Sequence, residues 1–242
     1  MSALLDRKHR ALDDFVARVK ESEIGDNIAK LILYGSVLRG DAHEESDIDV
    51  LVIATDDLRQ VDETCSDIAF DVMLDQGQRV SPMVYCVDVL RYPISYFSYS
   101  AVKKGKEVYS MEEKQLRRAE SLGYLELAIE YKQQSLRSLN VGDYRLALDG
   151  AYNAAELCAK GLLLLKLEDI PSSHGGIIQK FGEIWIKTDL LPREMGRGLN
   201  KGFELRNQAR YERHASIGED EVKALLALAK QFIDALSAEL GV

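Results

Sequence analysis

The sequence predicts an α+β fold, in which a small mixed-sheet domain precedes an all-α antiparallel helical bundle. Two observations support this fold class. Up to Ser110, short runs rich in β-branched residues alternate with helical segments, whereas from Met111 onward almost every segment has helical periodicity. The chain has 242 residues, of which 46% are hydrophobic, and this is enough for two modest cores. We therefore predict two domains, residues 1–110 and residues 111–242.

The first half is expected to build its sheet from short strands interleaved with helices. An amphipathic helix opens the chain, because apolar residues recur at helical spacing within residues 4–23. Pro82 confines its strand to an edge of the sheet, because proline has no backbone N–H to donate. After the first helix we expect strands at 29–34 and 48–54, a helical segment ending at Cys65, a strand at 68–74, an edge strand at 80–89, a helix within 92–105 and an extended segment at 107–109.

The second half is expected to fold as an antiparallel helical bundle. Gly142-Asp143 supplies a break followed by an N-cap, and Ile170-Pro171-Ser172-Ser173 supplies a second break. Acidic residues at 219–220 fall in the first turn of the last helix, where the helix dipole favours them. The expected helices are 112–140, 143–167, 173–188, 193–213 and 218–239.

Composition and charge exclude several classes of protein. The net charge of -9 argues against a general nucleic-acid coat but leaves room for a local nucleotide or RNA cleft. No secretory signal opens the chain, and the longest apolar run, 224–229, is too short for a bilayer. Three scattered cysteines form neither a disulfide framework nor a metal pair. We therefore expect a cytoplasmic protein without a membrane partner.

The most informative segment lies between the first two expected strands. Gly35 permits close approach of a ligand to the backbone, and a helix starting at Ser36 would direct free N–H groups at a phosphate. Asp47 and Asp49 are two apart at the start of a strand, so both carboxylates leave the sheet on one face. Two like charges this close are costly unless cations lie between them. Carboxylate oxygens and nucleotide phosphates are the ligands that Mg²⁺ prefers.

A third acid is expected within the strand predicted at 68–74. Asp71 stands there among strand-forming residues, where packing explains a charge poorly. If this strand lies beside the second one, Asp71 reaches the same metals as Asp47 and Asp49. Three acids around two metal ions suit an in-line displacement at phosphorus.

This pattern resembles the minimal nucleotidyltransferases of the polymerase-β superfamily. Their motif runs Gly-Ser, then Arg-Gly, then Ser-Asp-x-Asp-hydrophobic, with a third Asp on a later strand. The resemblance covers about the first 110 residues, and its elements here are Gly35, Ser36, Arg39, Gly40, Ser46, Asp47, Asp49 and Asp71. It implies Mg²⁺-dependent nucleotidyl transfer from ATP or another NTP. Asp47 and Asp49 would be metal ligands and Asp71 a ligand or general base, with Asp67 as its competitor.

The second half resembles the HEPN family (higher eukaryotes and prokaryotes nucleotide-binding), on Asp143-Tyr144-Arg145-Leu146-Ala147, Ser173-His174-Gly175-Gly176 and Arg206-Asn207-Gln208-Ala209-Arg210-Tyr211. Active HEPN ribonucleases carry an Arg, four to six residues, then His. Here seven residues separate Arg206 from His214 and three separate Arg210 from it, while Tyr211 takes the place of a His at four-residue spacing. Arg206, Tyr211 and His174 are therefore candidate residues of a second site, and ribonuclease activity is not expected.

The sequence thus favours a nucleotidyltransferase, with AMP transfer from ATP to a hydroxyl as the leading reaction. The helical half would position or supply the acceptor. The alternatives are a HEPN ribonuclease or toxin-type protein regulated by the first domain, and a catalytically idle nucleotide-binding module. The acceptor is open among a small molecule, a protein and an RNA. The apolar stripes of the bundle also leave one face free, so the sequence allows a homodimer through the helical domain.

Overall fold

The computed structural model describes residues 3–242 and divides the chain into two compact units, Met1–Leu116 and Arg117–Val242. We call them the N-terminal unit and the helical unit. The first is built on a mixed four-stranded sheet and the second is entirely helical, which confirms the predicted fold class. The chain was predicted to divide after residue 110, and residues 1–2 of that first domain lie outside the described residues.

The sheet of the N-terminal unit has the order β3-β2-β1-β4. β1 pairs antiparallel with both β2 and β4, whereas β2 and β3 run parallel and are joined by a helix. The predicted edge position of the strand that contains Pro82 is confirmed, because β3 lies at one end of the sheet. The strands are β1 (Ile28–Tyr34), β2 (Ile48–Ala54), β3 (Val80–Cys86) and β4 (Lys106–Ser110).

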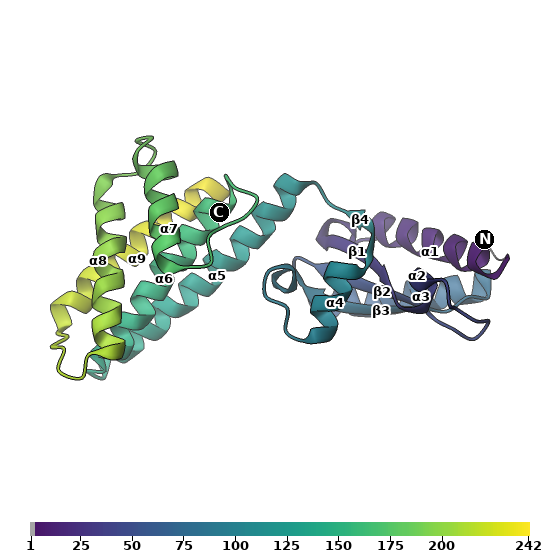
Figure 1. Ribbon diagram of the computed structural model, residues 1–242, viewed down its shortest axis with the longest axis horizontal. Coiled ribbons are helices and arrows are strands. Elements are labelled where there is room, and N and C mark those ends of the chain that lie inside the picture. Colours follow the sequence, from purple (N-terminus) through teal and green to yellow (C-terminus); the bar gives the residue numbers. More distant parts are fainter. Residues whose placement is uncertain (1–2) are drawn as a thin grey trace. The chain divides into compact units, whose positions relative to one another are not determined.

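Helices cover both faces of this sheet (Figure 1). One face packs against α1 (Ala3–Glu21) and α3 (Leu58–Gln76), and a core with Phe15, Val50 and Val52 fills the space between them. The other face carries Leu51 and Ile53 and packs against α4 (Tyr96–Lys104) and the 3₁₀ turn η2 (Val87–Leu90). Alternate residues of β2 therefore point to opposite helical layers. The turn η1 (Gly25–Asn27) precedes β1, and α2 (Gly35–Arg39) follows it.

The strand predicted at 68–74 is wrong, because these residues form the second half of α3. The buried residues of α3 are Val61, Cys65, Ala69 and Val72, which recur every three or four positions as the inner face of a helix requires. Asp57 caps its N-terminus by accepting a hydrogen bond from the backbone N–H of Gln60, at 3.1 Å. Helical periodicity over 19 residues outweighs the strand preference of a seven-residue apolar run.

The helical unit is a bundle with a single large apolar core (Figure 1). α6 is its central helix: Ala151, Tyr152, Ala155, Cys158 and Leu162 are all fully buried. The predicted helix at 173–188 is an α-helix followed by one π-helical turn, and the other four helices lie close to their predicted positions. The elements are α5 (Glu113–Asn140), α6 (Tyr144–Leu164), α7 (His174–Phe181), η3 (Gly182–Ile186), α8 (Arg193–Tyr211) and α9 (Glu219–Leu240).

Within residues 3–242, none of the helices is long and apolar enough to span a bilayer.

Candidate active site

The two predicted acids stand at the start of the central strand β2. Asp49 is the second residue of β2 and pairs with Tyr34, the last residue of β1. Gly35 follows Tyr34 with a φ of +75°, a conformation that glycine adopts without strain. A Cβ at this glycine would lie 1.9 Å from Oδ2 of Asp49. The backbone of the Gly35-Ser36 turn therefore approaches the Asp49 carboxylate more closely than any other residue type allows.

Burial and a neighbouring charge both act against ionisation of Asp49. The pKa of Asp49 is raised, first by burial and then by the negative charge of Asp47, while Arg39 works in the opposite direction. Burial and the Asp49 charge together raise the pKa of Tyr34 to about 12, so its hydroxyl keeps its proton at neutral pH. A cation between the two carboxylates would relieve the repulsion that raises the pKa of Asp49.

A protein cation already contacts Asp47. Nη2 of Arg79 lies 2.6 Å from Oδ2 of Asp47. The parallel register pairs Ile48 with Val80, so Arg79 and Asp47 each precede the paired segment on neighbouring strands. The Arg79 guanidinium therefore offsets the negative charge of Asp47 in this structure.

A buried lysine lies beneath the loop that carries these acids. Lys8 of α1 is only 1% exposed, and its ammonium donates to the backbone carbonyl of Ser46 at 2.6 Å and to Oε1 of Gln78 at 3.0 Å. Burial lowers the pKa of Lys8, while the charges of Glu44 and Asp47 act to raise it. Lys8 therefore ties the residue before Asp47 to the residue before Arg79 and fixes the entry to both strands.

The predicted third acid is not part of this cluster. Asp71 lies on the exposed face of α3, because the segment is helical and its inner positions are apolar. Among the described residues no group of three His, Cys, Asp or Glu side chains could hold a metal ion, so the expected three-acid cluster is wrong. Asp67 lies on the same helix and is also exposed. The residue of β3 that pairs with Asp49 is Ser81, which gives the site a hydroxyl where a third carboxylate was expected.

The remaining predicted nucleotide-binding residues lie around the short helix α2. With only five residues, α2 contributes little dipole, so phosphate contacts would depend on individual groups. Arg39 is exposed and donates to Asp41 at 3.2 Å. The Ser46 hydroxyl accepts a hydrogen bond from the backbone N–H of His43 at 3.0 Å and so stabilises the turn before Asp47. Gly40 ends α2 with a φ of +80°.

A cavity of about 470 Å³ opens beside Gly35. Its walls combine aromatic rings with two cations, since Tyr34 and Phe97 meet edge to face at 5.3 Å between ring centres and both Arg39 and Lys104 line it. The other lining residues are Gly35, Leu38, Ser100, Ala101 and Gly105. Because Gly35 touches Asp49, this cavity adjoins the acid pair.

The helical unit holds a separate polar cluster around Glu156. This carboxylate is buried and accepts a hydrogen bond from the Tyr152 hydroxyl at 3.0 Å, and it pairs with Nδ1 of His174. The imidazole of His174 stacks on Phe203 with ring centres 5.2 Å apart. Burial and the Glu156 charge raise the pKa of Tyr152, so this hydroxyl acts as a donor. His174 thus joins the first turn of α7 to α6 and α8.

The other two candidate residues of the helical half, Arg206 and Tyr211, differ in their exposure to solvent. Arg206 is buried, and its Nε lies 3.4 Å from Oδ1 of Asp149. The other oxygen of Asp149, Oδ2, accepts a hydrogen bond from Nη2 of Arg210 at 2.7 Å. Tyr211, the last residue of α8, is 74% exposed. The buried guanidinium of Arg206 is therefore engaged within the fold, whereas the Tyr211 ring faces solvent.

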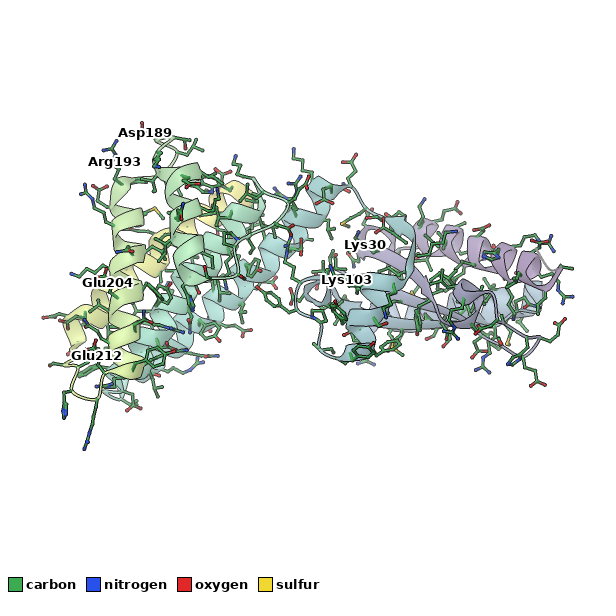
Figure 2. All side chains as sticks on the ribbon, in the orientation of Figure 1. Lys30, Lys103, Asp189, Arg193, Glu204 and Glu212 are labelled. Carbon is green, nitrogen blue, oxygen red and sulfur yellow. The ribbon has the colours of Figure 1, made fainter. Side chains whose placement is uncertain are left out.

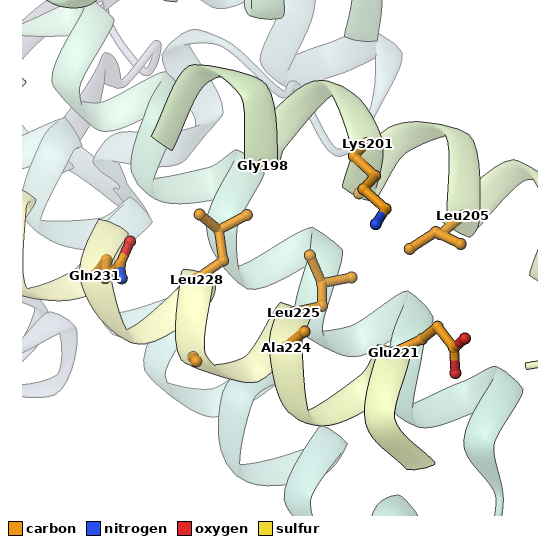
Figure 3. Close-up of a pocket in the computed structure, with 10 residues that line it drawn as sticks. Gly198, Lys201, Leu205, Glu221, Ala224, Leu225, Leu228 and Gln231 are labelled. Carbon is orange, nitrogen blue, oxygen red and sulfur yellow. The ribbon is translucent and has the colours of Figure 1, made fainter. Parts of the chain in front are cut away.

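Arg145 fixes the segment that follows α8. Its guanidinium donates to the backbone carbonyls of Ala209, Glu212, Arg213 and Ala215, at 2.7 to 3.2 Å. His214 lies within this segment and is exposed. A smaller cavity of about 240 Å³ lies between α8 and α9, lined mainly by apolar and small residues such as Gly198, Leu225 and Leu228 (Figure 3). None of the three predicted residues of the helical half lines it.

Sequence reasoning missed Arg79, Lys8 and Ser81. A parallel pairing of the second strand with the strand at 80 would have placed Arg79 beside Asp47 and Ser81 beside Asp49. The signal for Lys8 is weaker: it shares a helical face with Ala11, Leu12 and Phe15, an apolar stripe on which a lysine is unexpected.

Comparison with known proteins assigns both halves. Residues 19–114 match the model of the family described as polymerase beta, nucleotidyltransferase, and residues 122–239 match that of the HEPN domain. A Methanocaldococcus jannaschii protein provisionally named a protein adenylyltransferase is 30% identical over 103 residues, which cover 42% of this chain and 98% of that protein. The chain belongs to the polymerase-β nucleotidyltransferase family and carries a HEPN domain.

Two further comparisons concern another curated protein and a solved structure. A second Methanocaldococcus jannaschii protein, provisionally named a toxin, is 32% identical over 42% of this chain and 71% of its own length. The crystal structure of a spectinomycin adenyltransferase from Enterococcus faecialis with ATP and spectinomycin covers 93% of this chain and 98% of its own, with 11% identity and a TM-score of 0.30. That score is too low to support an argument about fold or function.

Replacement of Gly35 by alanine should disrupt the nucleotidyltransferase site while leaving the fold in place. Both Gly35 and Gly40 have positive φ, so Gly35→Ala and Gly40→Ala pay a similar backbone cost of about 1–2 kcal/mol. Only the new Cβ at position 35 collides with Asp49, whereas a Cβ at position 40 meets nothing within 4 Å. We expect Gly35→Ala to lower Mg²⁺–ATP affinity at least about tenfold relative to Gly40→Ala, measured by calorimetry. Equal affinities would contradict the close approach of Gly35 to Asp49.

Proposed function

We propose that this protein transfers AMP from ATP to a hydroxyl acceptor in a Mg²⁺-dependent reaction. The observation that carries the proposal is the Asp47–Asp49 pair at the start of β2, held against the Gly35-Ser36 turn. Membership of the nucleotidyltransferase family and the similarity of this chain to a protein named as an adenylyltransferase support the choice of reaction.

The residues present fit a divalent cation. Asp47 and Asp49 are two residues apart at the start of β2 and offer carboxylate oxygens on one face of the sheet, and such oxygens are ligands that Mg²⁺ prefers. The Arg79 guanidinium beside Asp47 indicates that this position favours a cation. Bound Mg²⁺ would neutralise phosphate charge and hold the phosphates in line for displacement.

The residues of this chain would bind and align the substrate. The cavity beside Gly35 offers the Phe97 ring to a base and the cations of Arg39 and Lys104 to phosphates. The acceptor oxygen attacks the α-phosphorus, the bond from that phosphorus to the β-phosphate oxygen breaks, and pyrophosphate leaves. Tyr34 stays protonated and Ser81 is a weak base, so the acceptor proton passes to solvent water. Catalysis would therefore rest on positioning and charge.

The helical unit would position or supply the acceptor. A ribonuclease in this unit is the alternative function, and its support is the HEPN match together with a relative named as a toxin. Against it, the guanidinium of Arg206 is buried and paired with Asp149, so it would have to leave an ion pair to reach a phosphate. We also retain from the sequence, as expectations, a cytoplasmic location and a homodimer through the helical domain.

Nucleotide binding should require both acids of β2 and should not require Asp71. The double variant Asp47→Asn/Asp49→Asn removes the charges that would hold Mg²⁺, so ATP affinity in the presence of Mg²⁺ should fall by about 100-fold or more. Asp71→Asn should bind as the wild type does, because Asp71 lies on the exposed face of α3. Calorimetry with and without Mg²⁺ measures both variants. Wild-type affinity in the double variant would overturn the proposed function.

A third carboxylate beside Asp49 should accelerate the reaction. Ser81→Asp places an acid on the neighbouring strand in register with Asp49. A general base contributes roughly 10²–10⁴-fold to such reactions, so the rate of pyrophosphate release from ATP should rise about tenfold or more. Ser81→Asn is the matched control, since it has the same shape without the charge. The assay includes a cell extract as the source of acceptor. If the wild type and Ser81→Asp then both release no more pyrophosphate than the extract alone, the module is idle and the transfer reaction is wrong.

A further inference from the structure

The outer surface of α4 carries exposed aromatic rings and lysines in two adjacent rows. Tyr96, Tyr99 and Lys103 follow each other at i, i+3 and i+7 and therefore form one stripe of the helix. Tyr96 is 78% exposed and Tyr99 is 48% exposed. Lys103, labelled in Figure 2, is exposed at the end of this stripe. We call these three residues the outer stripe.

The neighbouring row of α4 faces the cavity beside the acid pair. Phe97, Ser100 and Lys104 have the same i, i+3, i+7 spacing, and all three line that cavity. The rings of Tyr34 and Phe97 meet edge to face with their centres 5.3 Å apart. The outer stripe is thus one row away from the space that we assign to the nucleotide, on the same helix.

The segment that contains α4 is positively charged, whereas the whole chain is negatively charged. The sequence from Val89 to Lys106 contains no Asp or Glu, although the whole chain has a net charge of -9. Lys103, Lys104 and Lys106 are all exposed. An acidic protein that concentrates exposed lysines beside exposed rings presents a local attraction for a polyanion.

We propose that the outer stripe of α4 binds single-stranded nucleic acid. Successive unpaired bases stack on exposed aromatic rings, and lysines track the phosphate backbone, which is the combination found where proteins bind single strands without reading their sequence. Rings one helical turn apart at positions 96 and 99 suit consecutive bases, and Lys103 continues the same line toward the backbone. A duplex keeps its bases stacked inside and offers no such partners.

The composition of the stripe disfavours a protein partner. The buried centre of a protein–protein interface is depleted in lysine, whereas this surface has lysine at the end of both rows. Phe97 and Ser98 stand between the two tyrosines, and Ser98 is buried, so the exposed surface there is aromatic. Ile94, two residues before the stripe, is the exposed aliphatic residue of this segment. Tyrosine and lysine together favour a charged planar partner over an apolar one.

This surface names an acceptor class for the proposed reaction. A strand held on the outer stripe would bring its terminal hydroxyl beside the cavity that we assign to ATP. Attack of that oxygen on the α-phosphorus would form a phosphodiester and release pyrophosphate, with the proton passing to water. This consequence rests on the proposed function, whereas strand binding itself does not.

The test is fluorescence anisotropy of the full-length protein with labelled 12-nucleotide single strands of RNA and DNA, and with the matching RNA duplex. ATP and Mg²⁺ are left out, so that binding does not depend on the acid pair. We expect single strands to bind and the duplex to bind at least about tenfold more weakly. Tyr96→Ala/Tyr99→Ala should weaken single-strand binding about tenfold or more, whereas Tyr96→Phe/Tyr99→Phe should retain it, because the ring and not the hydroxyl stacks.

Matched controls separate this surface from general effects of charge and exposure. Phe70→Ala/Leu74→Ala removes two exposed side chains one turn apart on α3 and should bind as the wild type does. Lys103→Gln should reduce the slope of log affinity against log salt by about 0.7, whereas Lys187→Gln in the helical unit should leave it unchanged. Circular dichroism and gel filtration establish that each variant keeps its fold and oligomeric state.

Three results would overturn the proposal. The first is the absence of single-strand binding at low salt, and the second is equal binding of single strands and duplex. The third is loss of compactness or of the oligomeric state in Tyr96→Ala/Tyr99→Ala without loss of nucleic-acid binding. This third result would identify a protein-docking surface. Calorimetry on Asp47→Asn/Asp49→Asn tests the proposed function separately. If single strands bind but Asp47→Asn/Asp49→Asn binds ATP as the wild type does, the nucleic-acid surface stands and the transferase reaction is wrong. If the double variant loses ATP binding but single strands do not bind, only the nucleic-acid surface is wrong.

Discussion

The structure of the N-terminal unit depends on the cost of holding two carboxylates together at the start of β2. Burial raises the pKa of Asp49, and the negative charge of Asp47 adds to this effect. Two neighbouring cations offset this unfavourable effect. Lys8 donates a hydrogen bond to the Ser46 carbonyl, and Arg79 contacts Asp47 directly. The proposed function gives this pair of acids a use, since a divalent cation bound between them would offset their repulsion.

The sheet register converts this constraint into a site. Antiparallel pairing brings Tyr34 beside Asp49, and the turn that follows can come close only because residue 35 is glycine. Parallel pairing on the other side brings Ser81 to the same level of the sheet. The nucleotidyltransferase half thus surrounds its acids with backbone, a phenol and a hydroxyl, and a cavity lined by Gly35 and Phe97 opens toward α4. In the proposed reaction, a site with two acids and no third acid would act by binding and aligning the substrate.

Local patterns in the sequence predicted most of the fold because each is decided by neighbouring residues. The β2 strand at 48–54 and the helices of the second half follow directly from hydrophobic period, and Gly35, Asp47 and Asp49 follow from motif spacing. The strand prediction at 68–74 was wrong because a short apolar run fits either a strand or a helix. Only the buried row from Val61 to Val72 decides between the two. Arg79, Lys8 and Glu156 acquire their roles through pairings over long sequence separations, which no local pattern contains.

The account depends most directly on where a divalent cation binds. Crystals of the protein grown with Mn²⁺ and a non-hydrolysable ATP analogue would locate the metal by its anomalous scattering. We predict metal within bonding distance of both Asp47 and Asp49, the phosphates beside the Gly35-Ser36 turn, and the Arg79 guanidinium displaced from Asp47. Metal bound at other residues, or a nucleotide bound with Arg79 still paired to Asp47 and no metal between the acids, would contradict it.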